Sequence, residues 1–215
     1  MTEPQRLVLW GVGTGRALRA HWALAELGLE YESRPIQPRT GETKTPEYTA
    51  LTARQKIPLL QDGSFTITES AAIIAYLSDT YASDETALMP RAARERAKCL
   101  EWCFFIMTEL DAASLYVIRR HRYLPEIYGA APDVCDSAAA YFGQQMRTVE
   151  RQLAEDRPYL FGDRLTAADI LLSTCLTWAV NYGIPVDARA VAYNARITAR
   201  PAYRQAVVRN TPPKP

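Results

Sequence analysis

The sequence predicts a globular fold of two domains, an α/β domain at the amino terminus and an all-helical domain after it. Helix-type and strand-type patterns alternate as far as Tyr81, and strand patterns almost vanish from Arg91 onward. Residues 82–90 between them are small and polar and end in proline, as a linker would. With 48% hydrophobic and 23% charged residues, the chain can bury a core in each part. We therefore predict domains at residues 1–81 and 91–215.

The first elements form a βαβ unit. Arg6 to Trp10 is a short apolar run, typical of a buried strand, and Ala17 to Leu27 has apolar residues at three- and four-residue spacing, typical of a helix. Gly28 stands where a helix C-cap falls, and "LEYESRPI" at residues 29–36 is typical of a second strand. Because a helix crosses between the two strands, we expect the sheet to begin with a parallel pair.

A hairpin and a helix complete the α/β domain. The apolar runs Ile57 to Leu60 and Ser64 to Ile67 flank Asp62 and Gly63, and an Asp-Gly turn between apolar runs is a strong hairpin signal. The alanine-rich stretch at residues 69–81 then has helical spacing. The predicted order is βαβ, loop, ββα.

Three long helical patterns make up the second domain, at residues 91–124, 132–156 and 165–183. In the third, Thr166 and Asp169 have the spacing of a capping box. This motif predicts a role in folding rather than in catalysis.

Composition excludes several classes of partner. The 25 Lys and Arg nearly balance 24 Asp and Glu, so a net charge of +1 offers no field for nucleic acid or an anionic membrane. The amino terminus lacks the basic start and apolar run of a signal peptide, and no stretch reaches the roughly 18 apolar residues of a membrane helix, which favours a cytoplasmic protein. The four cysteines are unevenly spaced, so reduced thiols are expected rather than a disulfide framework.

The glycine-rich turn "WGVGTG" after the first strand allows two interpretations. A strand, a glycine turn, a helix and an acidic residue about 20 positions further on outline a dinucleotide-binding fingerprint. The spacing fails, because the sixth position is Arg16 counted from Gly11 and Leu18 counted from Gly13, where that motif has Gly or Ala. No Gly-Lys-Ser/Thr follows the turn, which excludes a P-loop.

The element order and four motifs resemble the cytosolic glutathione transferases along nearly the whole chain. The first domain of that family is thioredoxin-like (βαβ-ββα) and the second is all helical. The resemblance implies a homodimeric enzyme, paired through the edge of the first and third helices, that activates the glutathione thiol for attack on a small electrophile without a metal or bound redox cofactor. The matching motifs are "ALAELGLEYE", "KTPEYTALTARQKIPLLQDGSFTITESAAIIAYL", "LFGDRLTAADILL" and "ARPAYRQAV".

Six residues match family positions that bind glutathione. Ile57-Pro58 stands where the family has a cis peptide, which turns the backbone before proline toward the cysteinyl part of the ligand. Glu69 and Ser70 open the third helix, where free N–H groups favour a carboxylate and a side-chain carboxylate can bind an ammonium group. Without the resemblance, Pro58 would begin an edge strand, Glu69 and Ser70 would be ordinary first-turn residues, and the loop lysines would be solvated. The implied set is Lys44, Lys56, Ile57, Pro58, Glu69 and Ser70.

Thr14 matches the position at which serine-type classes of the family place the hydroxyl that hydrogen-bonds to the glutathione sulfur. A donor at the sulfur lowers the thiol pKa and so produces the nucleophilic thiolate. Thr14 also fits the N-cap of the first helix, and the two roles can coexist. The backbone N–H of Gly15 is an alternative donor, so both residues are candidate catalytic groups. No tyrosine precedes Tyr31 and no cysteine precedes Cys99, which excludes tyrosine-type and cysteine-type chemistry in this turn.

Two departures from the family pattern affect the predicted site. Threonine is less usual than serine at position 14, and its extra methyl group restricts χ1, so we expect a less adjustable hydroxyl. In "LTARQKIP", Thr52, Ala53 and Gln55 stand where Asn, Pro and Gly are frequent, so this loop is expected to differ in shape.

A cationic and aromatic stretch, "SLYVIRRHRYL", ends the first long helix of the second domain. In the family this helix end borders the electrophile pocket, and such a wall would suit an acidic or carbonyl-bearing substrate. A solvated helix end with snorkelling arginines is the other interpretation. The candidate residues are Tyr116, Arg119, Arg120 and Tyr123.

Two alternatives to a transferase use the same fold. A glutathione-dependent peroxidase or thiol reductase would use the same site and release a disulfide, whereas a non-catalytic module would bind glutathione without activating it. Cys99 and Cys103 lie one helical turn apart with no histidine at matching spacing, so core thiols are expected rather than a metal site. His21 and His121 belong to no hydrolase motif.

Overall fold

A four-stranded mixed sheet organises the amino-terminal part of the chain, in a computed structural model that describes residues 7–155 and 157–213. β1 runs parallel to β2 and antiparallel to β3, and β3 runs antiparallel to β4, so the parallel start and the hairpin are both confirmed. Arg6, the predicted first residue of β1, lies outside the described residues. The strands are β1 (Leu7–Trp10), β2 (Glu32–Arg34), β3 (Leu59–Asp62) and β4 (Phe65–Thr68), in the sheet order β2-β1-β3-β4.

The hairpin lies further along the chain than the sequence predicts. Asp62 pairs with Phe65 inside the ladder, so the two-residue turn begins at Gly63, whose φ of 59° glycine adopts easily. Asp62 is buried, and its Oδ2 accepts hydrogen bonds from the hydroxyls of Tyr76 (2.6 Å) and Tyr81. These two donors explain why a carboxylate is tolerated at the end of a buried strand.

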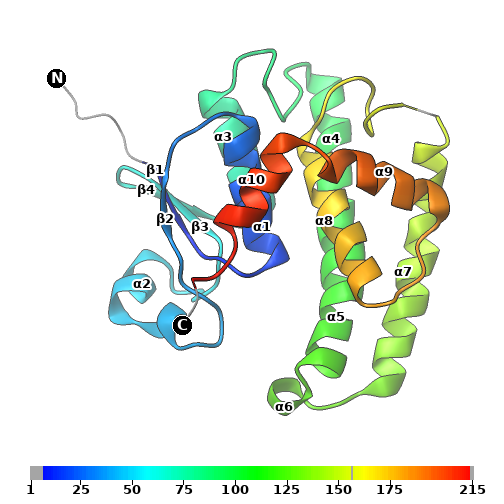
Figure 1. Cartoon of the computed structure of the whole chain (residues 1–215), viewed down its shortest axis with the longest axis horizontal. Helices are drawn as coiled ribbons and strands as arrows, with labels where there is room; N and C mark the ends of the chain where they lie inside the picture. Colours follow the sequence, from blue (N-terminus) through cyan, green and yellow to red (C-terminus); the bar gives the residue numbers. More distant parts are fainter. Residues whose placement is uncertain (1–6, 156, 214–215) are drawn as a thin grey trace. The chain divides into compact units, whose positions relative to one another are not determined.

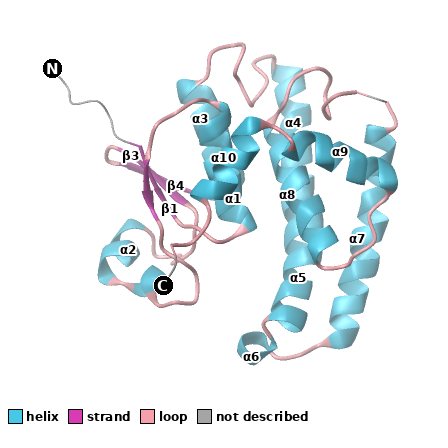
Figure 2. Ribbon diagram, viewed as in Figure 1, coloured by secondary structure: helices cyan, strands magenta, loops and turns pink. Residues whose placement is uncertain are grey.

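Helices cover both faces of the sheet (Figure 2). Side chains alternate along a strand, so the buried Leu7 and Leu9 face one layer and Trp10 faces the other. Trp10 packs with Leu59 of β3 and with Tyr48 of the short helix on its side, and all three are buried. The helices of this layered arrangement are α1 (Gly15–Glu26), η1 (Glu42–Lys44), α2 (Pro46–Leu51) and α3 (Ser70–Tyr81).

The rest of the described chain up to Thr198 is helical. The three predicted long helices are confirmed, but the first contains two π-helical stretches, η2 and η3, that the sequence did not indicate. At the end of η2 the backbone N–H of Tyr116 donates to the carbonyl of Asp111, five residues earlier, as in a π-helix. The elements are α4 (Ala93–Phe105), η2 (Ile106–Leu115), α5 (Tyr116–Ile118), η3 (Arg119–Tyr123), α6 (Pro125–Tyr128), α7 (Pro132–Leu153), α8 (Ala167–Asn181) and α9 (Ala188–Thr198).

The capping box at the start of α8 is present and serves the fold, as predicted. Asp169 is fully buried and accepts hydrogen bonds from the backbone N–H groups of Leu160 (2.8 Å) and Thr166 (2.7 Å) and from the hydroxyl of Tyr193 (2.5 Å). Burial raises the pKa of Asp169, while these hydrogen bonds oppose that change. The carboxylate therefore joins three segments of the helical part.

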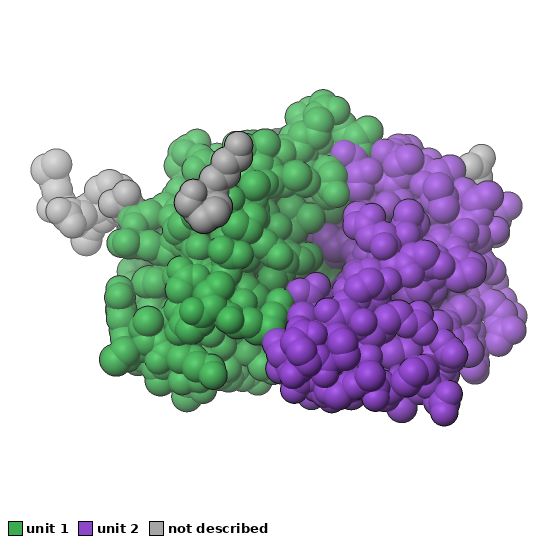
Figure 3. All heavy atoms as spheres, turned by 60° about the horizontal axis from the view of Figure 1, so that its bottom comes forward, with its two compact units in different colours: residues 1–89, 199–215 green, residues 90–198 purple. Residues whose placement is uncertain are grey.

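By packing, the chain divides into two compact units, residues 1–89 with 199–215 and residues 90–198 (Figure 3). The last helix, α10 (Pro201–Arg209), lies against α1 although the two are far apart in sequence (Figure 1). Arg200 donates from Nε and Nη2 to the carboxylate of Glu26 at 2.7 and 2.6 Å. The carboxyl-terminal segment, which we assigned to the helical domain from sequence, thus packs with the α/β unit.

Candidate active site

The turn between β1 and α1 places Thr14 at the N-cap of α1. Its backbone is extended (φ −132°, ψ 152°), and its Oγ1 accepts a hydrogen bond from the Ala17 N–H at 3.0 Å. An N-cap uses a lone pair of the hydroxyl and not its proton, so Thr14 can still donate a hydrogen bond. The N-cap interpretation is confirmed, and it is compatible with a donor role toward a ligand at the positive end of the helix dipole.

The two glycines that flank Thr14 differ in backbone conformation and in their surroundings. Gly13 has a φ of 77°, and a Cβ on it would lie 3.0 Å from Cγ of Pro212. Gly15 is the exposed first residue of α1, and a Cβ on it would meet nothing within 4 Å. Open space therefore lies beside Gly15 at the first turn of α1.

Gly11 connects this turn to the loop before β3. It has a φ of 114°, and a Cβ on it would lie 2.5 Å from Cβ of Ile57, so only glycine allows this approach. Its N–H donates to the Arg34 carbonyl at 2.9 Å, which extends the pairing of β1 with β2 past the end of the strand. Gly11 thus fixes the distance between the turn and Ile57.

A buried histidine supports the same glycine. His21 Nε2 lies 3.0 Å from the Gly11 carbonyl, and its Nδ1 lies 2.7 Å from the hydroxyl of Tyr31. Because a carbonyl only accepts, Nε2 carries the proton and Nδ1 accepts from Tyr31. Burial lowers the pKa of His21 to about 4, so the ring is neutral at neutral pH. The sequence indicated only that His21 packs or caps, and this contact depends on tertiary structure.

The loop before β3 carries the predicted cis peptide, since the bond between Ile57 and Pro58 is cis. Tyr48 is buried beneath this loop and donates from its hydroxyl to the carbonyl of Lys56 at 2.7 Å. Gln55 takes a left-handed conformation (φ 51°), which glycine adopts more easily. The side chains of Lys56 and Lys44 are both exposed.

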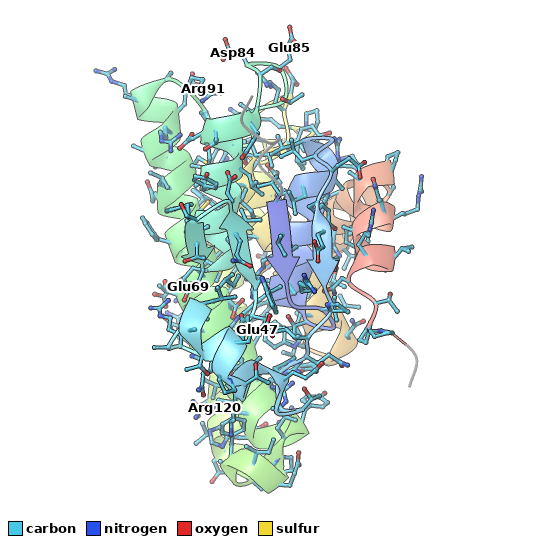
Figure 4. All side chains as sticks on the ribbon, turned by 90° about the vertical axis from the view of Figure 1, so that its left-hand side faces the viewer. Glu47, Glu69, Asp84, Glu85, Arg91 and Arg120 are labelled. Atoms are coloured by element: carbon cyan, nitrogen blue, oxygen red, sulfur yellow. The ribbon has the colours of Figure 1, made fainter. Side chains whose placement is uncertain are left out.

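Glu69 and Ser70 begin α3 in a strained geometry. Glu69 has a φ of 67° and a ψ of 114°, an unfavourable backbone for a residue with a side chain, and makes no capping bond. Its exposed carboxylate instead pairs with Arg54 at 2.7 Å (Glu69 is labelled in Figure 4). The Ser70 hydroxyl is buried and has no hydrogen-bond partner among the described residues. Backbone strain beside an unpartnered buried hydroxyl is typical of a ligand-binding position.

Strand register brings the turn after β1, the cis peptide and the start of α3 to one end of the sheet. Trp10 pairs with Leu59, and Leu59 pairs with Thr68. Gly11, Pro58 and Glu69 each lie one residue beyond this row, so the turn, the cis peptide and the start of α3 share an edge. Lys56 lies two residues from Pro58, whereas no strand pairing fixes the position of Lys44. Arg54, which forms an ion pair with Glu69, is a neighbour of the site that no sequence motif indicates.

The four candidates in the helical unit fall into two aromatic clusters. The guanidinium of Arg120 lies over the rings of Tyr128 (4.5 Å) and Tyr116 (5.9 Å). In the second cluster, the guanidinium of Arg119 lies 6.0 Å from the centre of the Trp178 ring. Nearby in this cluster, the ring of Tyr123 stacks on the ring of Tyr182 at 3.9 Å. Arg119 is half-buried and Arg120 is exposed, so both guanidinium groups lie against aromatic rings at a helix end that is still largely solvated.

Two family models cover most of the chain. Residues 5–79 match the glutathione S-transferase N-terminal domain, and residues 92–204 match the glutathione S-transferase C-terminal domain. The chain belongs to the glutathione S-transferase family. The predicted family, the α/β thioredoxin-like plus all-helical fold class, and the glutathione transferase enzyme class are thereby confirmed.

Individual relatives of this transferase cover nearly its whole length. It is 34% identical to maleylacetoacetate isomerase of Pseudomonas aeruginosa over 208 residues, which are 92% of this chain and 93% of the relative. It is 30% identical to glutathione S-transferase 3 of Zea mays over 207 residues, 92% and 91% of the two chains. The crystal structure of a theta class glutathione S-transferase from Xanthomonas axonopodis pv. citri, with glutathione bound, is 28% identical with a TM-score of 0.80 and covers 95% of this chain and 98% of that one.

The cysteines, the possible metal ligands and the helices of the transferase each bear on whether it has a further role. Its four cysteines are buried thiols that form no disulfide in the described part of the chain. Within residues 7–155 and 157–213, no three His, Cys, Asp or Glu side chains are grouped so that they could hold a metal ion. Over the same ranges, every helix is too short or too polar to cross a membrane.

Proposed function

We propose that the transferase activates glutathione through the hydroxyl of Thr14. The observation that carries this proposal is the N-cap geometry, in which Oγ1 accepts from Ala17 and keeps its proton for a ligand. A glutathione sulfur in the open space beside Gly15 would accept one hydrogen bond from the Thr14 hydroxyl and one from a backbone N–H. A hydrogen bond to sulfur stabilises the thiolate relative to the thiol and therefore lowers the thiol pKa.

We place the γ-glutamyl end of glutathione at the start of α3. There the unpartnered Ser70 hydroxyl and the first N–H groups of the helix can bind its carboxylate, and Glu69 can bind its ammonium group. The backbone of Ile57 would pair with the cysteinyl residue, next to the cis bond to Pro58. The exposed ammonium groups of Lys44 and Lys56 are the candidates for the glycyl carboxylate. Strand register supports this arrangement, because Gly11, Pro58 and Glu69 share one edge.

In the proposed reaction, the thiolate attacks an electrophilic carbon, a sulfur–carbon bond forms, and the leaving group departs with the electron pair. The thiol proton passes to solvent when glutathione ionises, and the substitution involves no change of oxidation state. Tyr116, Arg119, Arg120 and Tyr123 are proposed to face the electrophile, with a preference for acidic or carbonyl-bearing substrates. Such chemistry would suit a role in detoxification.

We propose a cytoplasmic homodimer that uses α3, as expected from the sequence, together with β4 in place of α1. Most of α1 is buried, and α3 and α10 pack against it, so it offers little surface to a second subunit. β4 and α3 are better candidates, since Phe65 of β4 is 46% exposed and lies 4.8 Å from the ring of Tyr76 of α3. The molar mass in solution tests the dimer, and a lower molar mass for Phe65→Arg would support β4 as part of the contact.

Ultraviolet difference titration with glutathione tests the proposed activation, using the native protein, Thr14→Ala and Thr14→Ser. We expect a thiolate band below the pH at which free glutathione ionises, lost in Thr14→Ala and retained in Thr14→Ser. A band that survives in Thr14→Ala would assign the role to a backbone donor such as the Gly15 N–H. Binding without a thiolate band in any variant would indicate a non-catalytic module, and disulfide formation with peroxide would indicate a peroxidase.

Glutathione-dependent isomerisation is a second candidate, favoured by the 34% identity to maleylacetoacetate isomerase of Pseudomonas aeruginosa. An isomerase would use the same thiolate but release glutathione unchanged. Turnover of maleylacetoacetate without consumption of glutathione would establish it, whereas consumption of glutathione with an aryl halide would favour the transferase reaction.

A further inference from the structure

The carboxyl end of α10 is joined to the turn that carries Thr14 through a single residue, Asn210. The N–H of Gly13 donates to the backbone carbonyl of Asn210 at 2.8 Å. The side chain of Asn210 donates from Nδ2 to the carbonyl of Thr14 at 3.2 Å. Pro212 follows and lies against Gly13, where its Cγ would be 3.0 Å from an added Cβ. Asn210 therefore holds the Gly13–Thr14 segment from both ends.

These two bonds fix a part of the backbone that would otherwise be free to rotate. Gly13 adopts a φ of 77°, and glycine has more conformational freedom than any other residue. The Thr14 carbonyl also accepts from the Leu18 N–H at 2.9 Å, so Asn210 occupies its second lone pair. With both groups held, the direction of the Cα–Cβ bond of Thr14 is set by α10 as well as by α1.

The direction of that bond is important because residue 14 is threonine. A β-branched side chain is restricted at χ1, so its hydroxyl cannot readily turn to correct an error in the backbone. Positioning of Oγ1 against a ligand atom must therefore come from the backbone of Gly13 and Thr14, which Asn210 holds.

Stability alone does not account for the Asn210 side chain. Its Oδ1 is buried and has no hydrogen-bond partner among the described residues. The benefit of the bond to Thr14 and the cost of this unpaired oxygen are of similar size and opposite sign. Truncation of Asn210 should therefore change the stability of the fold little, while it removes the side-chain bond to the Thr14 carbonyl and leaves the backbone bond to Gly13 in place.

We infer that Asn210 is a positioning residue that orients the Thr14 hydroxyl toward the glutathione sulfur, an inference that rests on the proposed role of Thr14. Asn210 does not touch the ligand itself. In its absence the Thr14 hydroxyl spends less time in the donating orientation, so the pKa of the bound thiol rises and less thiolate is present at neutral pH.

A double-mutant cycle of Thr14→Ala and Asn210→Ala tests this inference, with Asn210→Ser as a second variant that also lacks the amide. Thr211→Ala is the matched control, because Thr211 is exposed and, among the residues that the structure describes, its hydroxyl donates to the Val207 carbonyl of α10 at 2.8 Å. For each protein we would measure the thermal midpoint, the pH profile of the bound thiolate band, and kcat and KM for glutathione.

We expect Asn210→Ala to lower kcat at neutral pH by about three- to tenfold, with a higher thiolate pKa, a KM and thermal midpoint close to native, and a smaller deficit at alkaline pH. In the Thr14→Ala background it should have no further effect on the thiolate pKa. Unchanged activation in both Asn210 variants, or equal effects in both backgrounds, would overturn the inference while leaving the role of Thr14 intact. If Thr14→Ala itself leaves the thiolate pKa unchanged, the proposed function fails and the positioning role fails with it.

Discussion

Gly11 is the position at which one added methyl group should disturb the active-site turn most. Its φ of 114° is unfavourable for a residue with a side chain, at a cost of about 1–3 kcal/mol. The added Cβ would lie 2.5 Å from Cβ of Ile57, next to the main chain, and overpacking of this kind costs about 1–3 kcal/mol more. Gly11→Ala should therefore lower the free energy of unfolding by about 2–6 kcal/mol. For a chain of this length that corresponds to a fall in the thermal midpoint of roughly 5–20 °C.

Gly28→Ala is the matched control, because Gly28 also has a positive φ (64°) but a Cβ on it would meet nothing within 4 Å. Gly28→Ala should lower the free energy of unfolding only through the unfavourable backbone conformation, by about 1–2 kcal/mol. Thermal unfolding followed by circular dichroism would compare the two variants, and KM for glutathione should rise only in Gly11→Ala, which displaces Ile57. Equal thermal midpoints in the two variants would refute the steric argument.

Three further outcomes are expected. Burial holds the pKa of His21 at about 4, below its ordinary 6.5, so the unfolded chain binds the proton first as the pH falls, and up to about 3 kcal/mol of stability is lost between about pH 6.5 and 4. Urea unfolding at both ends of this range should show a smaller loss in His21→Gln, and an equal loss would contradict the assignment. Asp169→Ala leaves buried donors unpaired and should cost about 3–5 kcal/mol in urea unfolding, against almost nothing for the exposed Asp163→Ala. Ser70→Ala removes a hydroxyl without a protein partner, so it should leave the thermal midpoint unchanged but raise KM for glutathione about fivefold, and a fall in the midpoint with an unchanged KM would argue against a ligand role.

The parts of the fold predicted well from sequence are those fixed by local patterns. The apolar run of β1, the helical spacing of α1 and the capping box at Thr166 each depend on residues a few positions apart, and the structure contains all three elements. The hairpin was misplaced because Asp62 has a tertiary role: the hydroxyls of Tyr76 and Tyr81 keep its carboxylate within the strand, and this outweighs its preference for a turn.

The parts of the candidate site that were missed depend on contacts between distant residues. Thr14, Glu69 and the cis bond at Pro58 were found through motifs that the family shares. Asn210 reaches Thr14 across 196 positions of sequence, and no pattern around either residue indicates this contact. His21 is similar, since a lone histidine on a helix does not reveal that it will bind the carbonyl of the turn that precedes the helix.

The division of the α/β unit between the two ends of the chain sets an order for events during synthesis. β1 and α1 leave the ribosome early, but α10, which covers Trp22 and binds Glu26 through Arg200, follows only after residues 90–198. At about 5–20 residues per second, those residues take on the order of 10 s to translate. During that interval one face of α1 lacks its native cover and is open to chaperones. The helical unit, which is continuous in sequence, can finish folding first, and the nascent chain completes its sheet-containing half last.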